Sequence, residues 1–153
     1  MLVKTSGSAV YGVEALSITV EVNWMATNTG MVLVGLPDNA VKESLQRVES
    51  TIKSNGYMMP RTRVVVNLAP ADIKKSGTAF DLPIAIGVLA ASEQLENKQA
   101  IEKYVIMGEL SLDGEVRSIK GALPIAIVPQ AHLLSLVGLR LAGHDWPGDG
   151  VSD

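Results

Sequence analysis

The chain has 153 residues, of which 47% are hydrophobic, with a formal net charge of −3 and no cysteine. This length and apolar content suit one domain with a sizeable core, and the lack of cysteine excludes disulfides and thiolate metal sites. The mild negative charge and the aromatic content of 4% disfavour a phosphate-reading surface or a base-stacking platform, although local patches stay possible.

The start of the chain and its apolar stretches indicate a cytoplasmic protein. The opening residues 1–4 do not lead into the long apolar run of a signal peptide. The longest nearly apolar stretch, residues 82–91, is about half the roughly 20 residues that a membrane span requires. We therefore expect no membrane partner, and we expect residues 82–91 to form a buried helix.

Two strands and an amphipathic helix are predicted in the first part of the chain. Residues 13–22 are rich in β-branched side chains and alternate from Leu16 onward, which predicts a strand with one solvated face. Residues 31–36 are shorter and more apolar, and predict a central strand covered on both faces. Asp38 predicts the N-cap of a helix whose apolar residues recur at helical spacing until Gly56.

A strand at residues 62–68 is followed by the apolar helix. Asp81 is expected to cap this helix, with Pro83 in its first turn. Because residues 82–91 are apolar almost all round, we place the helix in the middle of the fold.

Short strands are expected after the apolar helix. The short apolar run at residues 104–108 predicts the first of them. Asp113 and Gly114 predict a two-residue hairpin turn between residues 109–112 and 115–119. A closing helix is expected to begin near Gly121.

These elements predict an α+β fold, a mixed sheet with helices packed on it and an element order of roughly βββαβαββα. The main domain is expected to cover residues 1–128. Residues 129–153 are atypical, because Pro129 interrupts the last helix and four glycines follow from Gly138 onward. We expect this tail to be poorly ordered.

No catalytic, cofactor or metal site is predicted from the motifs. The chain has no Gly-x-x-x-x-Gly-Lys-Ser/Thr segment and no Gly-x-Gly-x-x-Gly after a strand, so it should not hydrolyse ATP by itself. His132 and His144 lack the regularly spaced ligands of a zinc site. Ser76 stands beside Lys74 and Lys75, but lysines in a loop normally point to solvent, which argues against a catalytic serine.

One loop and two arginines predict a contact surface. We expect the residues that contact a partner or DNA to be Arg61, Arg63, Asp72, Lys74 and Lys75. The alternative is an ordinary solvated loop next to a helix start, since most loops lie on the surface whether or not they bind anything.

Four sequence blocks carry a family resemblance. They are Gly-Ser-Ala-Val-Tyr-Gly-Val-Glu-Ala at 7–15, Val-Gly-Leu-Pro-Asp-Asn-Ala-Val-Lys-Glu-Ser at 34–44, Asn-Leu-Ala-Pro-Ala-Asp-Ile-Lys-Lys-Ser-Gly-Thr-Ala-Phe-Asp-Leu-Pro at 67–83, and Gly-Glu-Leu-Ser-Leu-Asp-Gly-Glu-Val-Arg at 108–117. In this order the blocks resemble the N-terminal domain of magnesium-chelatase-like ATPases of the ComM/YifB type, over residues 1–128. The resemblance implies a fold similar to the second domain of ribosomal protein S5, which the proteolytic domain of Lon protease also uses.

The similarity to Lon raises the question of peptidase activity. Laying this chain on the Lon pattern places Ala79 where Lon has its serine and Pro124 where Lon has its lysine. Neither side chain can do that chemistry, and Ser76 and Lys120 are the nearest substitutes.

The resemblance further implies an AAA+ motor domain as partner, which binds ATP and magnesium, forms rings and is linked to DNA processing during competence. That motor is absent from these residues, and the sequence after Val128 departs from the family pattern; a truncated chain, a shifted reading frame or a degenerate gene would each explain this. The leading interpretation is a non-catalytic, N-terminal accessory domain that engages DNA or protein for the ATPase. A divergent Lon-like Ser/Lys peptidase and a stand-alone nucleic-acid-binding module are the alternatives.

Overall fold

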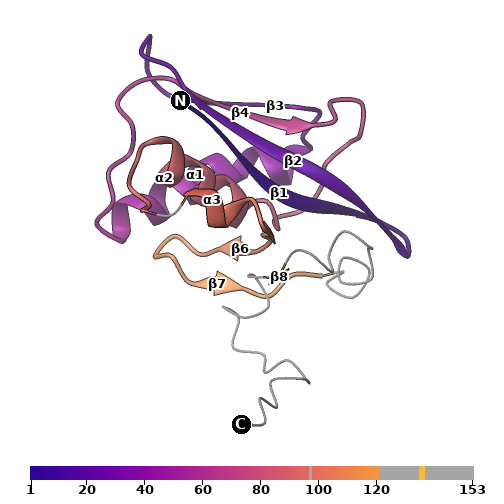
Figure 1. Cartoon of the computed structure of the whole chain (residues 1–153). Helices are drawn as coiled ribbons and strands as arrows, with labels where there is room; N and C mark the ends of the chain where they lie inside the picture. The colour runs from indigo at the N-terminus through magenta and orange to yellow at the C-terminus, as the bar shows by residue number, and fades with distance from the viewer. Residues whose placement is uncertain (97, 121–134, 137–153) are drawn as a thin grey trace, which may run out of the picture.

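The computed structural model describes residues 1–96, 98–120 and 135–136, which form a mixed sheet with helices packed against it (Figure 1). In chain order the elements are β1 (Leu2–Tyr11), β2 (Glu14–Trp24), β3 (Met31–Val34), α1 (Asn39–Ser54), β4 (Val64–Ala69), α2 (Asp81–Ala91), α3 (Lys98–Ile101), β5 (Tyr104–Val105), β6 (Glu109–Leu110), β7 (Val116–Arg117) and β8 (Ser135–Leu136). The predicted α+β class is confirmed. In the structure α2 is followed by α3 and then by four short strands, β5 to β8. The predicted closing helix and the tail lie outside the described residues, apart from β8.

Within the described ranges, the main sheet has six strands in the order β3-β4-β2-β1-β5-β8, and β6 pairs separately with β7. β1 and β2 form a long antiparallel hairpin, β4 runs antiparallel to β2, and β3 runs parallel to β4. The prediction that residues 31–36 form a central strand is therefore wrong, because β3 is an edge strand and Val34 is 43% exposed. A short apolar run indicates that side chains pack on a core, but it does not say how many strands lie beside them.

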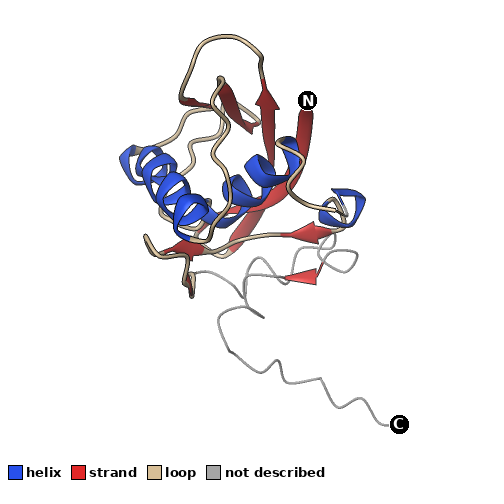
Figure 2. Cartoon of the chain, turned by 90° about the vertical axis from the view of Figure 1, so that its left-hand side faces the viewer, coloured by secondary structure: helices blue, strands red, loops and turns tan. Residues whose placement is uncertain are grey.

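Alternation along the strands separates a buried face from an open one. The buried side chains of β2 and β4 are Ile18, Val20, Val22, Val64, Val66 and Leu68. Figure 2 shows α1 and α2 together on one side of the sheet, and the contacts of α2 with β1 and β2 place the core there. On the opposite face Glu21 lies between its cross-strand partners, 3.6 Å from the Lys4 ammonium and 2.8 Å from the Asn67 amide.

The amphipathic helix is confirmed as α1. Asp38 is its N-cap, and its carboxylate accepts a 2.8 Å hydrogen bond from the Val41 amide. Val41, Val48 and Ile52 are buried against the core, as their helical spacing predicts.

Helix α2 lies in the middle of the fold, as its apolar composition predicts, and ten of its eleven residues are buried. It packs so closely on β2 that a Cβ on Gly87 would stand 2.5 Å from a methyl of Val22. The prediction that Asp81 caps this helix is wrong: Phe80 holds the N-cap position, and Asp81 is the first helical residue. In the described ranges, no helix has the length and apolar character needed to cross a bilayer.

The β6–β7 hairpin forms as predicted, with a longer turn. The Ser111 amide donates to the Glu115 carbonyl at 2.9 Å, which leaves three residues in the loop instead of two. Gly114, the last of them, has a φ of 96°, a conformation that favours glycine. A three-residue loop that ends in a left-handed glycine also matches the twist of a hairpin, so the Asp-Gly signal located the turn but not its length.

Candidate functional site

The five residues predicted as a contact surface do not come together. Arg61 and Arg63 precede β4, whereas the loop with Asp72 and Lys74 follows it. Six residues of strand separate the two groups by about 20 Å at 3.3 Å per residue. Arg61, Asp72 and Lys74 are exposed, and Arg63 is half-buried.

Lys75, the fifth residue of that set, is fully buried and is not part of an exposed surface. Its ammonium donates to the Gly35 carbonyl at 2.8 Å and also to the Pro70 carbonyl. Burial lowers the pKa of Lys75, while the nearby charge of Asp72 works in the opposite direction. The sequence gives no local sign of this, because a lysine in a polar loop is normally solvated.

Lys75 joins the segments before α1 and before α2 into one unit. Its amide donates to the Leu36 carbonyl at 3.1 Å, and its carbonyl accepts from the Asp38 amide at 2.9 Å. Gly35 lies so close to β4 that a Cβ there would stand 2.2 Å from the Leu68 carbonyl oxygen. The second and third sequence blocks therefore meet here, and their glycine and lysine hold two loops together.

The surroundings of Ser76 do not form a serine–lysine pair. The Lys75 ammonium is already engaged by two backbone carbonyls, and the side chains of Ser76 and Lys120 belong to exposed residues. Ala79 packs against the core, and its carbonyl accepts a 2.9 Å bond from Gly108. Pro124 lies outside the described residues.

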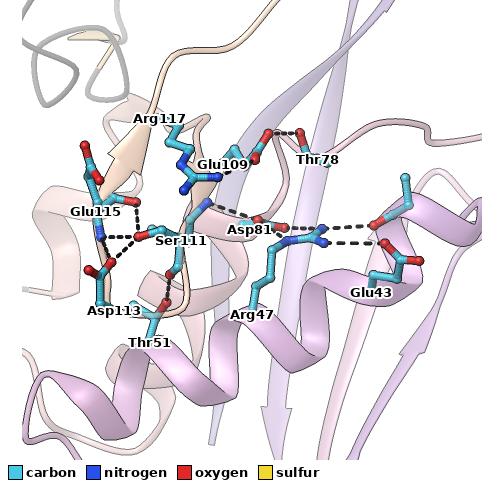
Figure 3. A network of polar contacts seen from close by, with 12 residues as sticks. Glu43, Arg47, Thr51, Thr78, Asp81, Glu109, Ser111, Asp113, Glu115 and Arg117 are labelled. Carbon is cyan, nitrogen blue, oxygen red and sulfur yellow. Dashed lines mark hydrogen bonds and ion pairs between the residues drawn. The ribbon is translucent and has the colours of Figure 1, made fainter.

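A buried ion pair links α1, α2 and the hairpin (Figure 3). Arg47 of α1 donates two hydrogen bonds to the fully buried carboxylate of Asp81, at 2.6 Å from Nε to Oδ2 and at 3.1 Å from Nη2 to Oδ1. The Leu110 amide of β6 donates to the same carboxylate at 3.0 Å. The hydrogen bond to Asp81, ahead of the charges around it, raises the pKa of Arg47. Both carboxylate oxygens of Asp81 thus have partners, which marks this network as structural.

The hairpin also lies along the exposed side of α1. The Thr51 hydroxyl donates to the Ser111 carbonyl at 2.8 Å, and the Asn55 amide donates to the Asp113 carbonyl at 3.1 Å. Thr78, in the loop before α2, donates to Glu109 of β6 at 2.6 Å. In residues 1–96, 98–120 and 135–136, no group of three His, Cys, Asp or Glu side chains is placed to hold a metal ion. His132 and His144 lie outside these ranges.

A cleft of about 830 Å³ lies at the end of the sheet where β2 ends and β3 and β4 begin. Its lining combines aromatic, methionine and charged side chains from five segments: Trp24; Thr29, Gly30 and Met31; Glu49 and Lys53 of α1; residues 57–62; and Ser92 and Gln94. Of the predicted contact residues, Arg61 is in this lining. This size falls within the range of ligand-binding pockets, so we take the cleft as the candidate functional site.

Trp24 and Tyr57 are the aromatic residues of this lining, and the sequence did not single them out. Their type is scarce in the chain, and nothing in the local sequence places them together. Trp24 reaches the cleft because it pairs with Val64, next to the segment that holds Arg61. Its indole donates to the Thr62 hydroxyl, and Gln94 holds Met58 with bonds of 2.8 Å and 2.7 Å to its amide and carbonyl.

Comparison with known proteins gives consistent matches. The profile of the family described as the ChlI subunit of Mg-chelatase matches residues 20–137. The uncharacterized protein YifB of Escherichia coli (strain K12) is 47% identical over 118 residues, which cover 77% of this chain and 23% of YifB. The competence protein ComM of Haemophilus influenzae is 41% identical over 129 residues, 84% of this chain and 25% of ComM. The chain spans about a quarter of the length of these relatives. The chain therefore belongs to the magnesium-chelatase-like family that includes ComM and YifB.

Proposed function

We propose that this chain is the non-catalytic, N-terminal accessory domain of a ComM-type AAA+ ATPase linked to DNA processing, with a fold of the ribosomal protein S5 domain 2 type. It engages a DNA or protein partner in the cytoplasm for a motor domain that binds ATP and magnesium and forms the ring. Family membership supports this assignment, and these 153 residues contain no phosphate-binding loop of their own.

The cleft beside Arg61 is the observation that carries the proposal. Its walls offer surface for recognition, and several of its polar side chains are already engaged in structural contacts. Glu49 and Lys53 pair with each other at 2.5 Å, and the Ser92 hydroxyl donates to the Val88 carbonyl at 2.8 Å. A nucleophile needs a base within reach, and in this lining Glu49 is paired with Lys53 and the Ser92 hydroxyl is bonded to its own helix.

DNA binding is tested first, by fluorescence anisotropy of the purified chain with single-stranded, duplex and four-way-junction DNA over a salt series. A DNA-engaging domain loses affinity as salt rises, and each neutralised phosphate contact lowers the slope of log affinity against log salt by about 1. The variants are Arg61→Ala, Arg63→Ala and Lys74→Ala. Lys103→Ala is the matched control, because Lys103 is an exposed lysine near β5, away from the cleft.

The proposed lack of peptidase activity is tested in parallel, by incubating the chain with an unfolded protein substrate. No cleavage is expected, because the Lys75 ammonium is held by the Gly35 and Pro70 carbonyls and does not activate Ser76. Cleavage that disappears in Ser76→Ala would overturn the proposal in favour of a divergent peptidase. A chain that binds neither DNA nor peptide would also overturn it.

A further inference from the structure

The outer edge of β3 is open. In the described part of the chain β3 is the last strand on its side of the sheet, and no strand pairs with its outer edge. Its residues, Met-Val-Leu-Val, include neither a charge nor a proline, two of the devices that block the pairing of another chain. Four residues span about 13 Å, so this edge has room for a short extended segment only.

The cleft continues from the start of this edge. Gly30 and Met31 belong to the lining, and Met31 is also the first residue of β3. A chain that adds to the edge of β3 would therefore bring one end to the cleft. Met31, Met58 and Met59 give the walls flexible apolar side chains, which adapt to inserted side chains of different shapes.

The far wall of the cleft is held in place before anything binds. Gln94 fixes the backbone of Met58 at both its amide and its carbonyl, and the Trp24 indole is bonded to Thr62. A wall of this kind loses little conformational freedom on binding, which favours affinity. Tyr57 and Met58 are nonetheless 44% and 76% exposed, so their side chains are accessible to a ligand.

The charge of the cleft suits one carboxylate. Lys53 is neutralised by Glu49 at 2.5 Å, whereas Arg61 makes no hydrogen bond or ion pair with any residue that the structure describes. A nucleic-acid strand is held by several cations along its backbone, and a single unpaired guanidinium does not supply them. One guanidinium does match one acidic side chain, with a planar fork that fits a carboxylate.

We propose that β3 and the cleft bind an extended peptide segment of a partner protein, with its backbone paired to the edge of β3, an apolar side chain in the cleft and an acidic side chain on Arg61. This inference rests on the proposed role of the domain in engaging a partner, and it names that partner as protein. Strand addition of this kind takes its affinity from main-chain hydrogen bonds and its specificity from the side-chain pocket.

The test is a titration of the 15N-labelled chain, followed by amide chemical shifts. The probes are acetyl-Glu-Phe-Thr-Val-Thr-Val-amide and a peptide of the reverse sequence. One of them would pair parallel to β3 and the other antiparallel, and in each case the end with Glu and Phe would lie at the cleft. We expect shifts at residues 30–34 and 57–62. A version of the better peptide with alternate amides N-methylated should bind about tenfold more weakly, because it keeps the side chains and loses main-chain donors.

Protein variants test the cleft separately from the edge. Tyr57→Ala and Arg61→Ala should weaken the better peptide, Arg61→Ala by about threefold, as expected for an exposed ion pair. Lys74→Ala, an exposed cation beyond the other end of β4, should leave affinity unchanged.

Three outcomes would overturn the inference: no shifts at millimolar peptide, equal affinity for the N-methylated peptide, or shifts located away from β3 and the cleft. A twelve-residue oligo-dT that moves the same amides at lower concentration than the peptide would also overturn it, and would assign the cleft to nucleic acid. Binding of oligo-dT in place of the peptide would leave the proposed function standing. If neither the peptides nor any of the DNAs bound, both the proposed function and this inference would be overturned.

Discussion

Arg47 and Asp81, 34 positions apart in the chain, form a bidentate ion pair that connects the two main helices beneath the sheet. The carboxylate of Asp81 is fully buried, and it also receives the amide of Leu110. Three elements, α1, α2 and β6, therefore meet at one carboxylate. A buried charge is tolerated only where it is paired and hydrogen-bonded, and here both conditions are met.

Asp81→Asn is expected to lower the free energy of unfolding by about 3 kcal/mol, because the guanidinium of Arg47 keeps its charge and loses its partner. Urea denaturation with an unchanged m-value is the measurement. Glu43→Gln is the matched control: Glu43 is 3.6 Å from Arg47 but its side chain is 69% exposed, so its loss should change stability by less than about 0.5 kcal/mol. Equal effects of the two substitutions would contradict a structural role for the buried pair.

Lys75→Met is expected to lower the free energy of unfolding by about 2 kcal/mol, since the carbonyls of Gly35 and Pro70 lose a donor while the apolar stem is retained. Lys74→Met, at the exposed neighbouring position, should have little effect on urea denaturation. If both substitutions proved neutral, the buried ammonium would not hold the two loops together.

The buried ammonium also predicts a pH dependence. Burial lowers the pKa of Lys75 in the folded chain below its ordinary value of 10.5, so the unfolded chain binds more protons between these two values. The stability of the native chain relative to Lys75→Met should therefore rise with pH across that window and level off above 10.5. Urea midpoints of both proteins from pH 7 to 11 measure this, and a falling difference would contradict it.

Gly35→Ala is expected to lower the free energy of unfolding by about 3 kcal/mol or more, because the new methyl group would collide with the backbone of Leu68. Gly56→Ala is the control that measures the cost of a positive φ without a collision. Gly56 also has a positive φ, 78°, but a Cβ there meets nothing within 4 Å, so only the conformational cost of about 1 kcal/mol applies. Similar thermal unfolding of the two variants would show that the contact between the loop and β4 gives way.

Asn55→Ala is expected to loosen the β6–β7 hairpin without unfolding the domain. The Asn55 amide bridges the Thr51 and Asp113 carbonyls at 2.9 Å and 3.1 Å, and its loss removes about 1 kcal/mol of local stability. Hydrogen exchange of the Glu115 amide should speed up about fivefold, while exchange in β2 stays unchanged. Faster exchange in β2 as well would mean that Asn55 stabilises the whole domain.

Features of the fold that depend on neighbours in the sequence could be predicted from it, whereas features that depend on distant residues could not. The Asp38 cap, the amphipathic pattern of α1 and the apolar character of α2 are local signals, and each predicted its element correctly. The position of β3 beside β4, the ion pair of Asp81 with Arg47 and the bond of Lys75 to Gly35 join residues more than 30 positions apart. No local pattern reports such partners. The predictions of a central strand at residues 31–36 and of a cap at Asp81 were wrong for that reason, and the burial of Lys75 was not foreseen.

The candidate site divides in the same way. Arg61 was predicted as a contact residue from its charge, and the structure places it in the cleft beside Trp24 and Tyr57. The separation of Arg61 from Lys74 follows from β4, which runs between them, and the pairing of Trp24 with Val64 brings Trp24 beside the segment that holds Arg61. By itself the sequence determined helices α1 and α2, the β6–β7 hairpin, the α+β class and the four blocks that resemble the family, because local periodicity, capping and motif order are written along the chain. Only the tertiary structure decided which of these residues are buried, paired or exposed together, because strand register and helix packing join positions that are distant in sequence.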